Sequence, residues 1–404
     1  MIAVDPNPTP RSTERFPCFD GLRAIAAGAV LLVHVSLISG FDGRHPAGLG
    51  QYFARAEAGV YLFFLISGYL LYRPFVAARF DQRAGPGLRS YARRRALRII
   101  PAYWVALTVL ALVFDTRQRR DFSSIADVVI YYGFLQIYWN STVVGGLQQA
   151  WSLCTEASFY VFLPFWATLM RRVGRLRRSP NAQLVSELIG LAVLFAIGLG
   201  FRYAVVRSLP PGNTAVDGRL DWLPANADLF ALGMVLAVVR EWSLRRDHLP
   251  AVVDLVGRMS LLWWALAAIC YWAVSTQIGL GTGVGADSPR QWMERQVLYA
   301  GAAFFLLLPA VFGDQDRGII RRVLRARVMA LTGLISYGIY LWHEGVIDVW
   351  MRARDIAPFD GDFPSMLAVA VVGTIALAML SYVVVERPLL NRKPRERPRE
   401  AVPA

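Results

Sequence analysis

Long apolar runs constrain the fold of this chain more than any other feature of its sequence. A run of about 20 predominantly apolar residues can cross the roughly 30 Å hydrocarbon core of a bilayer as a helix. Because lipid offers no partner to backbone polar groups, such segments satisfy their own hydrogen bonds as α-helices. The composition agrees, since 18% of the 404 residues are charged, against about 25% in soluble domains. We therefore predict an all-α integral membrane protein that crosses the cell membrane several times. The candidate segments are residues 22–40, 58–78, 99–114, 126–139, 151–170, 185–206, 225–240, 259–278, 293–312, 330–351 and 365–385.

The net charge of +14 comes almost entirely from arginine, because Lys393 is the only lysine. In a soluble protein this charge would suggest nucleic acid. In a membrane protein, the distribution of the arginines among the loops first indicates how the chain is oriented in the membrane, since cytoplasmic loops carry an excess of basic residues. We therefore expect membrane lipids as partners and no nucleic acid. The single lysine nearly excludes a lysine nucleophile. Three scattered cysteines, Cys18, Cys154 and Cys270, exclude a disulfide scaffold.

Segment 126–139 decides the predicted orientation. If all eleven segments crossed, the five arginines of 171–178 and most later basic clusters would lie outside the cell. If 126–139 does not cross, every basic cluster falls on the cytoplasmic side. We therefore predict ten transmembrane helices, both termini cytoplasmic, and 126–139 as a re-entrant or interfacial segment. The basic clusters are 73–98, 171–178, 240–246, 317–327 and the carboxy-terminal tail.

The predicted domain organisation is simple, because the loops are too short for a second domain. Residues 1–18 form a cytoplasmic amino-terminal segment and residues 19–390 form the membrane domain. Residues 391–404 are rich in arginine, proline and glutamate. This composition predicts a disordered tail that lies on an anionic lipid surface.

Ionisable residues at membrane depth are costly and are candidates for function. Arg23 and His34 lie eleven residues apart on the first predicted helix, about three turns and roughly 16 Å along one face. His34 then lies near the middle of the membrane, where a histidine can act as a general base. A histidine that only hydrogen-bonds between helices fits equally well when His34 is taken alone. His343 at similar depth and Glu156 within the fifth candidate segment shift the balance towards a site, and Asp228 is another acid within a predicted span.

An arginine pair begins the third predicted span, in the sequence RRRALRIIPAYW of residues 93–104. Arg95 and Arg98 are three residues apart and share a helix face. Paired guanidinium groups suit phosphate, so this face predicts an anion site. Arg93 and Arg94 are better explained as anchors to lipid head groups. A glycine-rich phosphate loop is missing from the sequence, which argues against a nucleotide hydrolase.

The sequence WSLCTEASFY, residues 151–160, places an acid inside the membrane. Trp151 suits the outer aromatic belt. Glu156 lies about 7–8 Å deeper and needs a partner, most simply a histidine or arginine of another helix. Cys154 could serve as a nucleophile, although a buried thiol is more often inert.

A polar stripe marks the ninth predicted span, where residues 335–343 read ISYGIYLWH. Ser336, Tyr340 and His343 follow each other at spacings of four and three, so they share one helix face. Such a stripe can hold helices together or line a site. The stripe and Asp228 are our candidates for an acceptor or oxyanion site.

These motifs, taken in order, resemble the acyltransferase-3 family of integral-membrane O-acyltransferases. The resemblance extends from Phe19 to about Leu390. It begins with FDGLRAIAAGAVLLVH and GVYLFFLISGYLL in the first two spans, continues through the three motifs quoted above, and ends with SYVVVERP near the last span.

The resemblance implies transfer of an acyl group, commonly acetyl, from cytoplasmic acyl-CoA to a hydroxyl group. The acceptor would be a lipid-linked or cell-surface glycan, or a glycosylated natural product. It also implies that His34 is catalytic with Arg23 as its companion, that Arg95 and Arg98 bind acyl-CoA, and that Glu156 is the acid of the site. We expect acyl-CoA as co-substrate, no tightly bound cofactor and no metal, in the stand-alone form without a fused hydrolase-like domain.

A proton-coupled transporter or flippase of a glycolipid is the main alternative. Histidine, acids and arginine within the membrane would then form a proton relay. No internal repeat is visible in the sequence, and repeats are common in transporters. A carrier would not release CoA from acyl-CoA, whereas an acyltransferase would.

Overall fold

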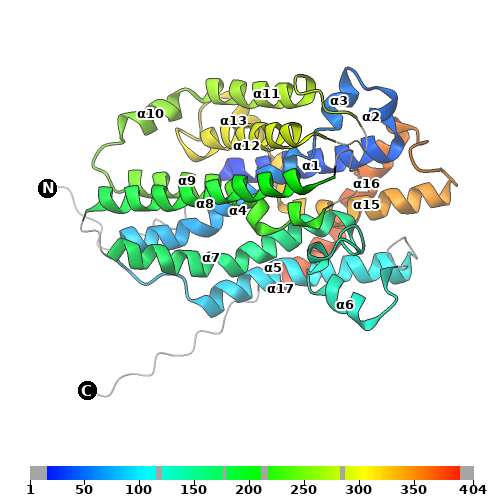
Figure 1. Cartoon of the computed structure of the whole chain (residues 1–404), viewed down its shortest axis with the longest axis horizontal. Coiled ribbons are helices and arrows are strands. Elements are labelled where there is room, and N and C mark those ends of the chain that lie inside the picture. Colours follow the sequence, from blue (N-terminus) through cyan, green and yellow to red (C-terminus); the bar gives the residue numbers. More distant parts are fainter. Residues whose placement is uncertain (1–15, 115–120, 176–178, 211–216, 283–286, 392–404) are drawn as a thin grey trace, which may run out of the picture.

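The computed structural model describes residues 16–114, 121–175, 179–210, 217–282 and 287–391, and within these ranges the chain is helical without strands (Figure 1). This confirms the predicted all-α class. The longest helices run roughly parallel or antiparallel in one bundle. They are α1 (Pro17–Ser39), α4 (Ala58–Phe80), α5 (Leu88–Thr108), α7 (Trp151–Arg175), α8 (Pro180–Ser208), α9 (Leu223–Ser243), α11 (Ser260–Thr276), α12 (Pro289–Val311), α15 (Ser336–Ala353) and α16 (Phe363–Ser381).

Short helices join or extend the long ones. Two π-helical segments prolong α5 and α16, and they are η2 (Val109–Val113) and η7 (Tyr382–Glu386). The short α-helices are α2 (Phe41–Arg44), α3 (Leu49–Phe53), α6 (Ile125–Tyr132), α10 (Ala251–Arg258), α13 (Ile319–Leu324), α14 (Arg327–Leu334) and α17 (Arg387–Leu390). The 3₁₀ turns are η4 (Gln136–Tyr138), η5 (Gln148–Ala150) and η6 (Gly218–Leu220).

Eight helices of the described chain are long and apolar enough to cross a membrane, or nine if the bent pair α10 and α11 forms one span. The ninth predicted span, residues 330–351, corresponds to α14 and α15, which are separated at Ile335. The 18 residues of α15 include the charged Glu344, Asp348 and Arg352, so this helix is not among the candidate spans. Helix α6 has eight residues, about 12 Å, which is too short to cross. The structure thus supports leaving 126–139 out of the spans, while the count of ten and the sides of the termini stay predictions.

Glycine allows α4 to approach both of its main neighbours closely. A Cβ atom at Gly59 would collide with the backbone carbonyl of Ala26 in α1. In the same way, Gly68 of α4 meets the carbonyl of Phe230 in α9, and Gly233 of α9 meets that of Leu65 in α4. Small residues at such crossings are typical of helix packing in membranes. They fix α4 between α1 and α9, where α1 and α4 form two walls of the site described below.

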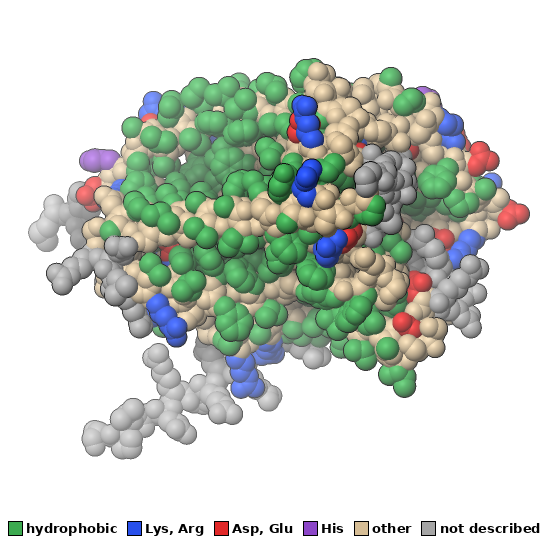
Figure 2. All heavy atoms as spheres, viewed as in Figure 1, with side chains coloured by type: hydrophobic (Ala, Val, Ile, Leu, Met, Phe, Trp, Pro, Cys, Tyr) green, Lys and Arg blue, Asp and Glu red, His purple; other side chains and the backbone are tan. Residues whose placement is uncertain are grey.

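Exposed apolar residues on the outside of the bundle recur at the spacing of a helix, so they form a stripe on its outer face. On α8, residues Val185, Ile189, Val193 and Ile197 follow each other at spacings of four and are each at least half exposed. Figure 2 shows hydrophobic side chains over much of the visible face. Charged residues such as Arg202 and Asp228 are instead buried inside the bundle. This arrangement suits a surface that faces lipid.

The basic clusters meet at one end of the bundle. Arg245 Nε, at the end of α9, lies 2.8 Å from Asp81 Oδ1, just after α4. Arg83 and Arg171 line one pocket at this end, and Arg240 and Arg317 line another. The clusters 73–98, 240–246 and 317–327 and the described part of 171–178 therefore lie together, as the predicted orientation requires. The predicted tail lies almost entirely outside the described residues.

Candidate active site

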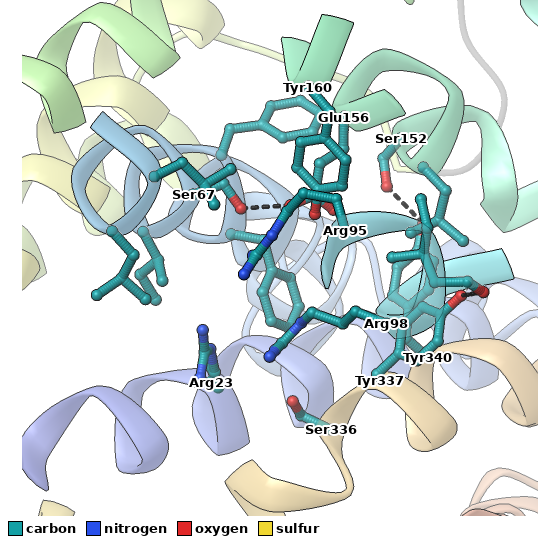
Figure 3. Close-up of a pocket in the computed structure, with 17 residues that line it drawn as sticks. Arg23, Ser67, Arg95, Arg98, Ser152, Glu156, Tyr160, Ser336, Tyr337 and Tyr340 are labelled. Atoms are coloured by element: carbon teal, nitrogen blue, oxygen red, sulfur yellow. Dashed lines mark hydrogen bonds between the residues drawn. The ribbon is translucent and has the colours of Figure 1, made fainter. Parts of the chain in front are cut away.

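A narrow polar pocket of about 80 Å³ lies between α1, α4, α5, α7 and α15 (Figure 3). Seventeen residues line it, and six of the nine predicted site residues are among them. The pocket thus brings together positions from four separate motifs of the sequence. The six predicted residues are Arg23, Arg95, Arg98, Glu156, Ser336 and Tyr340.

Three arginines converge in this pocket. Arg95 and Arg98 share one face of α5, as their spacing predicts, and Arg23 reaches the pocket from α1. Figure 3 shows the three guanidinium groups turned towards the same space. Glu156 is the single acid that lines the pocket, so the lining carries a net charge of +2. An anion with several oxygens would complement this charge.

The partner of Glu156 differs from the predicted one. Its carboxylate accepts a hydrogen bond from the hydroxyl of Ser67 in α4 (Figure 3). A serine, rather than the predicted histidine or arginine, is thus the hydrogen-bond partner that the structure shows for Glu156. The positive charge of the pocket still surrounds this acid, since Arg95 and Arg98 line the same space.

A second group of polar side chains forms where α1 meets α15. His34 Nε2 lies 2.9 Å from Glu344 Oε1, and His34 Nδ1 lies 3.1 Å from His343 Nε2. His34 Nδ1 is also 2.8 Å from the carbonyl oxygen of Val30. The side chain of Glu344 is 6% exposed and that of His34 is 23% exposed. His34 is therefore the reachable member of a buried cluster.

The neighbours of the two histidines indicate where their protons lie. His343 Nδ1 faces two backbone carbonyls, Tyr340 O at 2.9 Å and Ile339 O at 3.1 Å. Carbonyls only accept, so this nitrogen carries the proton and Nε2 of neutral His343 is an acceptor. His34 then faces three acceptors, which are Glu344, the carbonyl of Val30 and His343 Nε2. The cluster is built to stabilise a positive charge on His34.

Helix α15 connects the pocket to the histidine cluster. Ser336 and Tyr340 line the pocket, and His343 lies one turn further along the same helix. The rings of Tyr340 and His343 have centroids 6.0 Å apart. The hydroxyl of Tyr340 is 2.8 Å from Ser152 Oγ on the opposite wall. The predicted polar stripe therefore lines the pocket at one end and holds the cluster at the other.

Asp228 does not belong to this site. It does not line the pocket, and its Oδ2 accepts a hydrogen bond of 2.7 Å from Gln296 Nε2 of α12. The backbone of Asp228 lies against Gly198 of α8. The structure therefore places Asp228 apart from the other candidates for an acceptor or oxyanion site. Its depth in the membrane was compatible with the site, but its face of α9 points to other helices.

Several residues of the site were missed from the sequence. Glu344 is the most important, because it is the acid beside His34, whereas the family resemblance implied that Glu156 is the acid of the site. It is an ionisable residue directly after His343 within a predicted span, so its position alone could have marked it. Ser67, Ser152, Tyr160 and Tyr337 also line the pocket.

A wider cavity of about 650 Å³ adjoins the pocket at the arginine-rich end of the bundle. Both cavities are lined by Arg23 and Leu70. Arg73 and Arg325 add further positive charge, while Glu241 forms a buried ion pair of 2.5 Å with Arg73. Arg23 thus lies at the passage between a wide basic cavity and the narrow pocket.

The cluster of His34, His343 and Glu344 is also the one group of histidines and acids in the described ranges with the spacing of metal ligands. One potential ligand atom from each residue lies within 4.8 Å of the others. Two imidazoles and a carboxylate are a donor set that zinc accepts. The contacts of 2.9 and 3.1 Å, however, are hydrogen-bond distances that already satisfy the nitrogens of His34. The cluster therefore needs no ion to explain its geometry.

Comparison with known proteins identifies the class to which the chain belongs. The family described as "Acyltransferase domain" matches residues 16–383. The chain therefore belongs to this acyltransferase family, which confirms the resemblance found in the sequence motifs.

Among individual relatives, the chain is 22% identical to the O-acetyltransferase OatA of Staphylococcus aureus, over 94% of this chain and 58% of the relative. It is 23% identical to the peptidoglycan O-acetyltransferase OatA of Listeria monocytogenes, over 94% of this chain and 56% of the relative. The chain thus spans somewhat more than half the length of these relatives. No solved structure matches it.

Proposed function

We propose that this protein is a membrane O-acyltransferase that moves an acetyl group from acetyl-CoA to a hydroxyl group of a glycan. One observation carries the proposal. Three converging arginines line a pocket whose wall leads, along α15, to the buried pair of His34 and Glu344. The two relatives, an O-acetyltransferase and a peptidoglycan O-acetyltransferase, support acetyl as the group transferred and peptidoglycan or a similar glycan as the acceptor.

The arginines supply the binding site for the donor. The CoA part of an acyl-CoA carries several phosphate oxygens, which guanidinium groups bind in bidentate geometry. The wide cavity of about 650 Å³ suits the bulky nucleotide end. The narrow pocket of about 80 Å³ suits the slender arm that ends in the thioester. Arg23, Arg95 and Arg98 then hold the donor where the arm enters the bundle.

His34 is the general base of the proposed reaction. The acceptor oxygen attacks the thioester carbonyl, a C–O bond forms, and the C–S bond breaks. The hydroxyl proton passes to the unprotonated nitrogen of neutral His34. The imidazolium then protonates the departing thiolate to give free CoA, and His34 returns to its neutral form. Three acceptors around His34, including the Glu344 carboxylate, stabilise the imidazolium that forms. Tyr340, Ser152 and Ser336 are hydroxyl groups in the pocket that could donate to the oxyanion.

Mass spectrometry of cell-surface glycans tests the proposal together with its acceptor. Muropeptides and extracted glycolipids are compared between a deletion strain and the same strain complemented with the wild-type gene or with His34→Ala. We expect one glycoconjugate to carry an extra acetyl group with the wild-type gene and to lose it with His34→Ala. Identical glycans in all three strains, with the protein present in the membrane, would overturn the proposal. A change in the amount of an unacetylated glycolipid outside the cell would instead favour the flippase.

A further inference from the structure

A second large cavity, of about 740 Å³, lies at the arginine-rich end between α9, α10, α11 and α13. It shares no lining residue with the arginine pocket or with the wide cavity beside it. Four arginines and two aspartates line it, which gives the lining a net charge of +2. They are Arg240, Arg258, Arg317, Arg321, Asp254 and Asp314. The proposed acyl transfer gives this cavity no role.

The helices around this cavity have the arrangement expected at a membrane surface, with one helix crossing the membrane and another lying along it. Helix α10 is bent by 70° from α11, so if α11 crosses the membrane, α10 runs along its surface. Val252 and Leu255 of α10 are 73% and 55% exposed. On the other side of the cavity, Ile319 of α13 is 71% exposed. A surface helix with exposed apolar residues inserts them at the boundary between head groups and acyl chains.

Two of the four arginines are able to exchange their present partners. Arg258 lies 2.7 Å from Asp254, and Arg317 lies 3.1 Å from Asp314, but the two arginine side chains are 76% and 86% exposed. Exposed pairs of this kind contribute little to stability. A phosphate could therefore bind both guanidinium groups at little cost. Arg321 differs, because its guanidinium is buried and donates to the carbonyls of Pro309 and Phe312 at the end of α12.

Trp264 gives an independent sign of a missing partner. It lines the cavity from α11 and is 8% exposed. Its indole N–H is buried and has no hydrogen-bond partner among the described residues. A buried donor without a partner costs free energy unless a ligand satisfies it. Leu261, which is 68% exposed, continues the apolar surface beside it.

We propose that this cavity binds the head group of an anionic phospholipid, such as cardiolipin or phosphatidylglycerol. The phosphate contacts Arg258 and Arg317, and the acyl chains lie against Leu261 and the exposed residues of α10. On binding, the side chains around Trp264 move, so that its indole N–H, which is enclosed in this structure, donates to an oxygen of the same lipid. Basic pockets between helices on the cytoplasmic side are suited to such head groups. The lipid would thus be bound at a site separate from the proposed acyl-CoA pocket.

Native mass spectrometry of the purified protein in detergent tests this site. Cardiolipin is added at increasing concentration, and phosphatidylcholine serves as the zwitterionic reference. We expect cardiolipin adducts in wild type and binding on the order of tenfold weaker in the double variant Arg258→Gln/Arg317→Gln. The matched control is Arg290→Gln/Arg352→Gln, which removes two arginines that also form exposed pairs four residues apart. The control should bind cardiolipin like wild type.

Three results would overturn the proposal. The first is that the control variant loses as much cardiolipin affinity as Arg258→Gln/Arg317→Gln. The second is that wild type binds phosphatidylcholine as tightly as cardiolipin. The third is that CoA or inorganic phosphate displaces cardiolipin at constant ionic strength. Trp264→Phe provides a second variant that leaves the charge unchanged, and it should also weaken binding. Thermal unfolding in lipid-free detergent checks that the variants fold. Because binding is measured without acyl-CoA, the result does not depend on whether the proposed acetyl transfer is correct.

Discussion

Replacing Glu344 by glutamine tests whether the pair of His34 and Glu344 takes part in catalysis or only holds the helices together. The change keeps the shape of the side chain but removes the negative charge 2.9 Å from His34 Nε2. Since Glu344 is 6% exposed, water does not replace that charge. A hydrogen bond to a charged group contributes about 1.5–3 kcal/mol, and about 1.4 kcal/mol corresponds to a tenfold rate. We therefore expect kcat to fall about ten- to hundredfold.

The assay follows release of free CoA from acetyl-CoA by the purified protein in nanodiscs, with a peptidoglycan-derived disaccharide as acceptor. The KM for acetyl-CoA should change little, because the arginine pocket is untouched. Asp228→Asn is the matched control. It also replaces a buried carboxylate by the corresponding amide, at a residue that is 1% exposed. The new amide oxygen can still accept the hydrogen bond from Gln296. A kcat for Glu344→Gln within twofold of wild type would refute the reasoning. So would an equal fall in Asp228→Asn.

Three further changes test other parts of the account. Arg95→Ala/Arg98→Ala should raise the KM for acetyl-CoA on the order of a hundredfold, because two charge-assisted contacts are lost; an unchanged KM in the same assay would show that CoA binds elsewhere. Gly59→Ala should lower the thermal unfolding temperature in detergent, because the added Cβ would meet a backbone carbonyl of α1. Gly28→Ala is the control and should not lower it, because the space around Gly28 is open. Equal shifts of the unfolding temperature in the two variants would contradict this account of the packing. Cys154→Ala should keep its activity, because this buried thiol lies outside the pocket lining; a loss beyond tenfold in a folded variant would reopen a covalent mechanism.

The sequence was a good guide wherever a local rule applied. Runs of apolar residues located the long helices, and the spacing of three placed Arg95 and Arg98 on one face. The break at Ile335 was not foreseen, because the span 330–351 contains no proline that would predict a bend. Hydropathy reports how much a segment prefers lipid. It does not report where a helix bends to suit its neighbours.

Prediction of the site from the sequence has a similar limit. Membrane depth made Glu156, Asp228 and His343 equal candidates, but only packing decides which face of a helix meets which neighbour. Glu156 faces Ser67, and Asp228 faces Gln296. Glu344 follows His343 directly, and adjacent residues on a helix point about 100° apart. Only the position of α1 shows that both can contact His34.

Direct measurement of acetyl transfer in a defined bilayer tests the central claim. Purified protein is reconstituted into liposomes with acetyl-CoA that carries a labelled acetyl group, and with a glycan acceptor. The account predicts label on a glycan hydroxyl and an equal amount of free CoA with wild type, and neither product with His34→Ala. Acetyl-CoA that stays intact while unacetylated glycan crosses the bilayer would contradict the account. So would full transfer by His34→Ala.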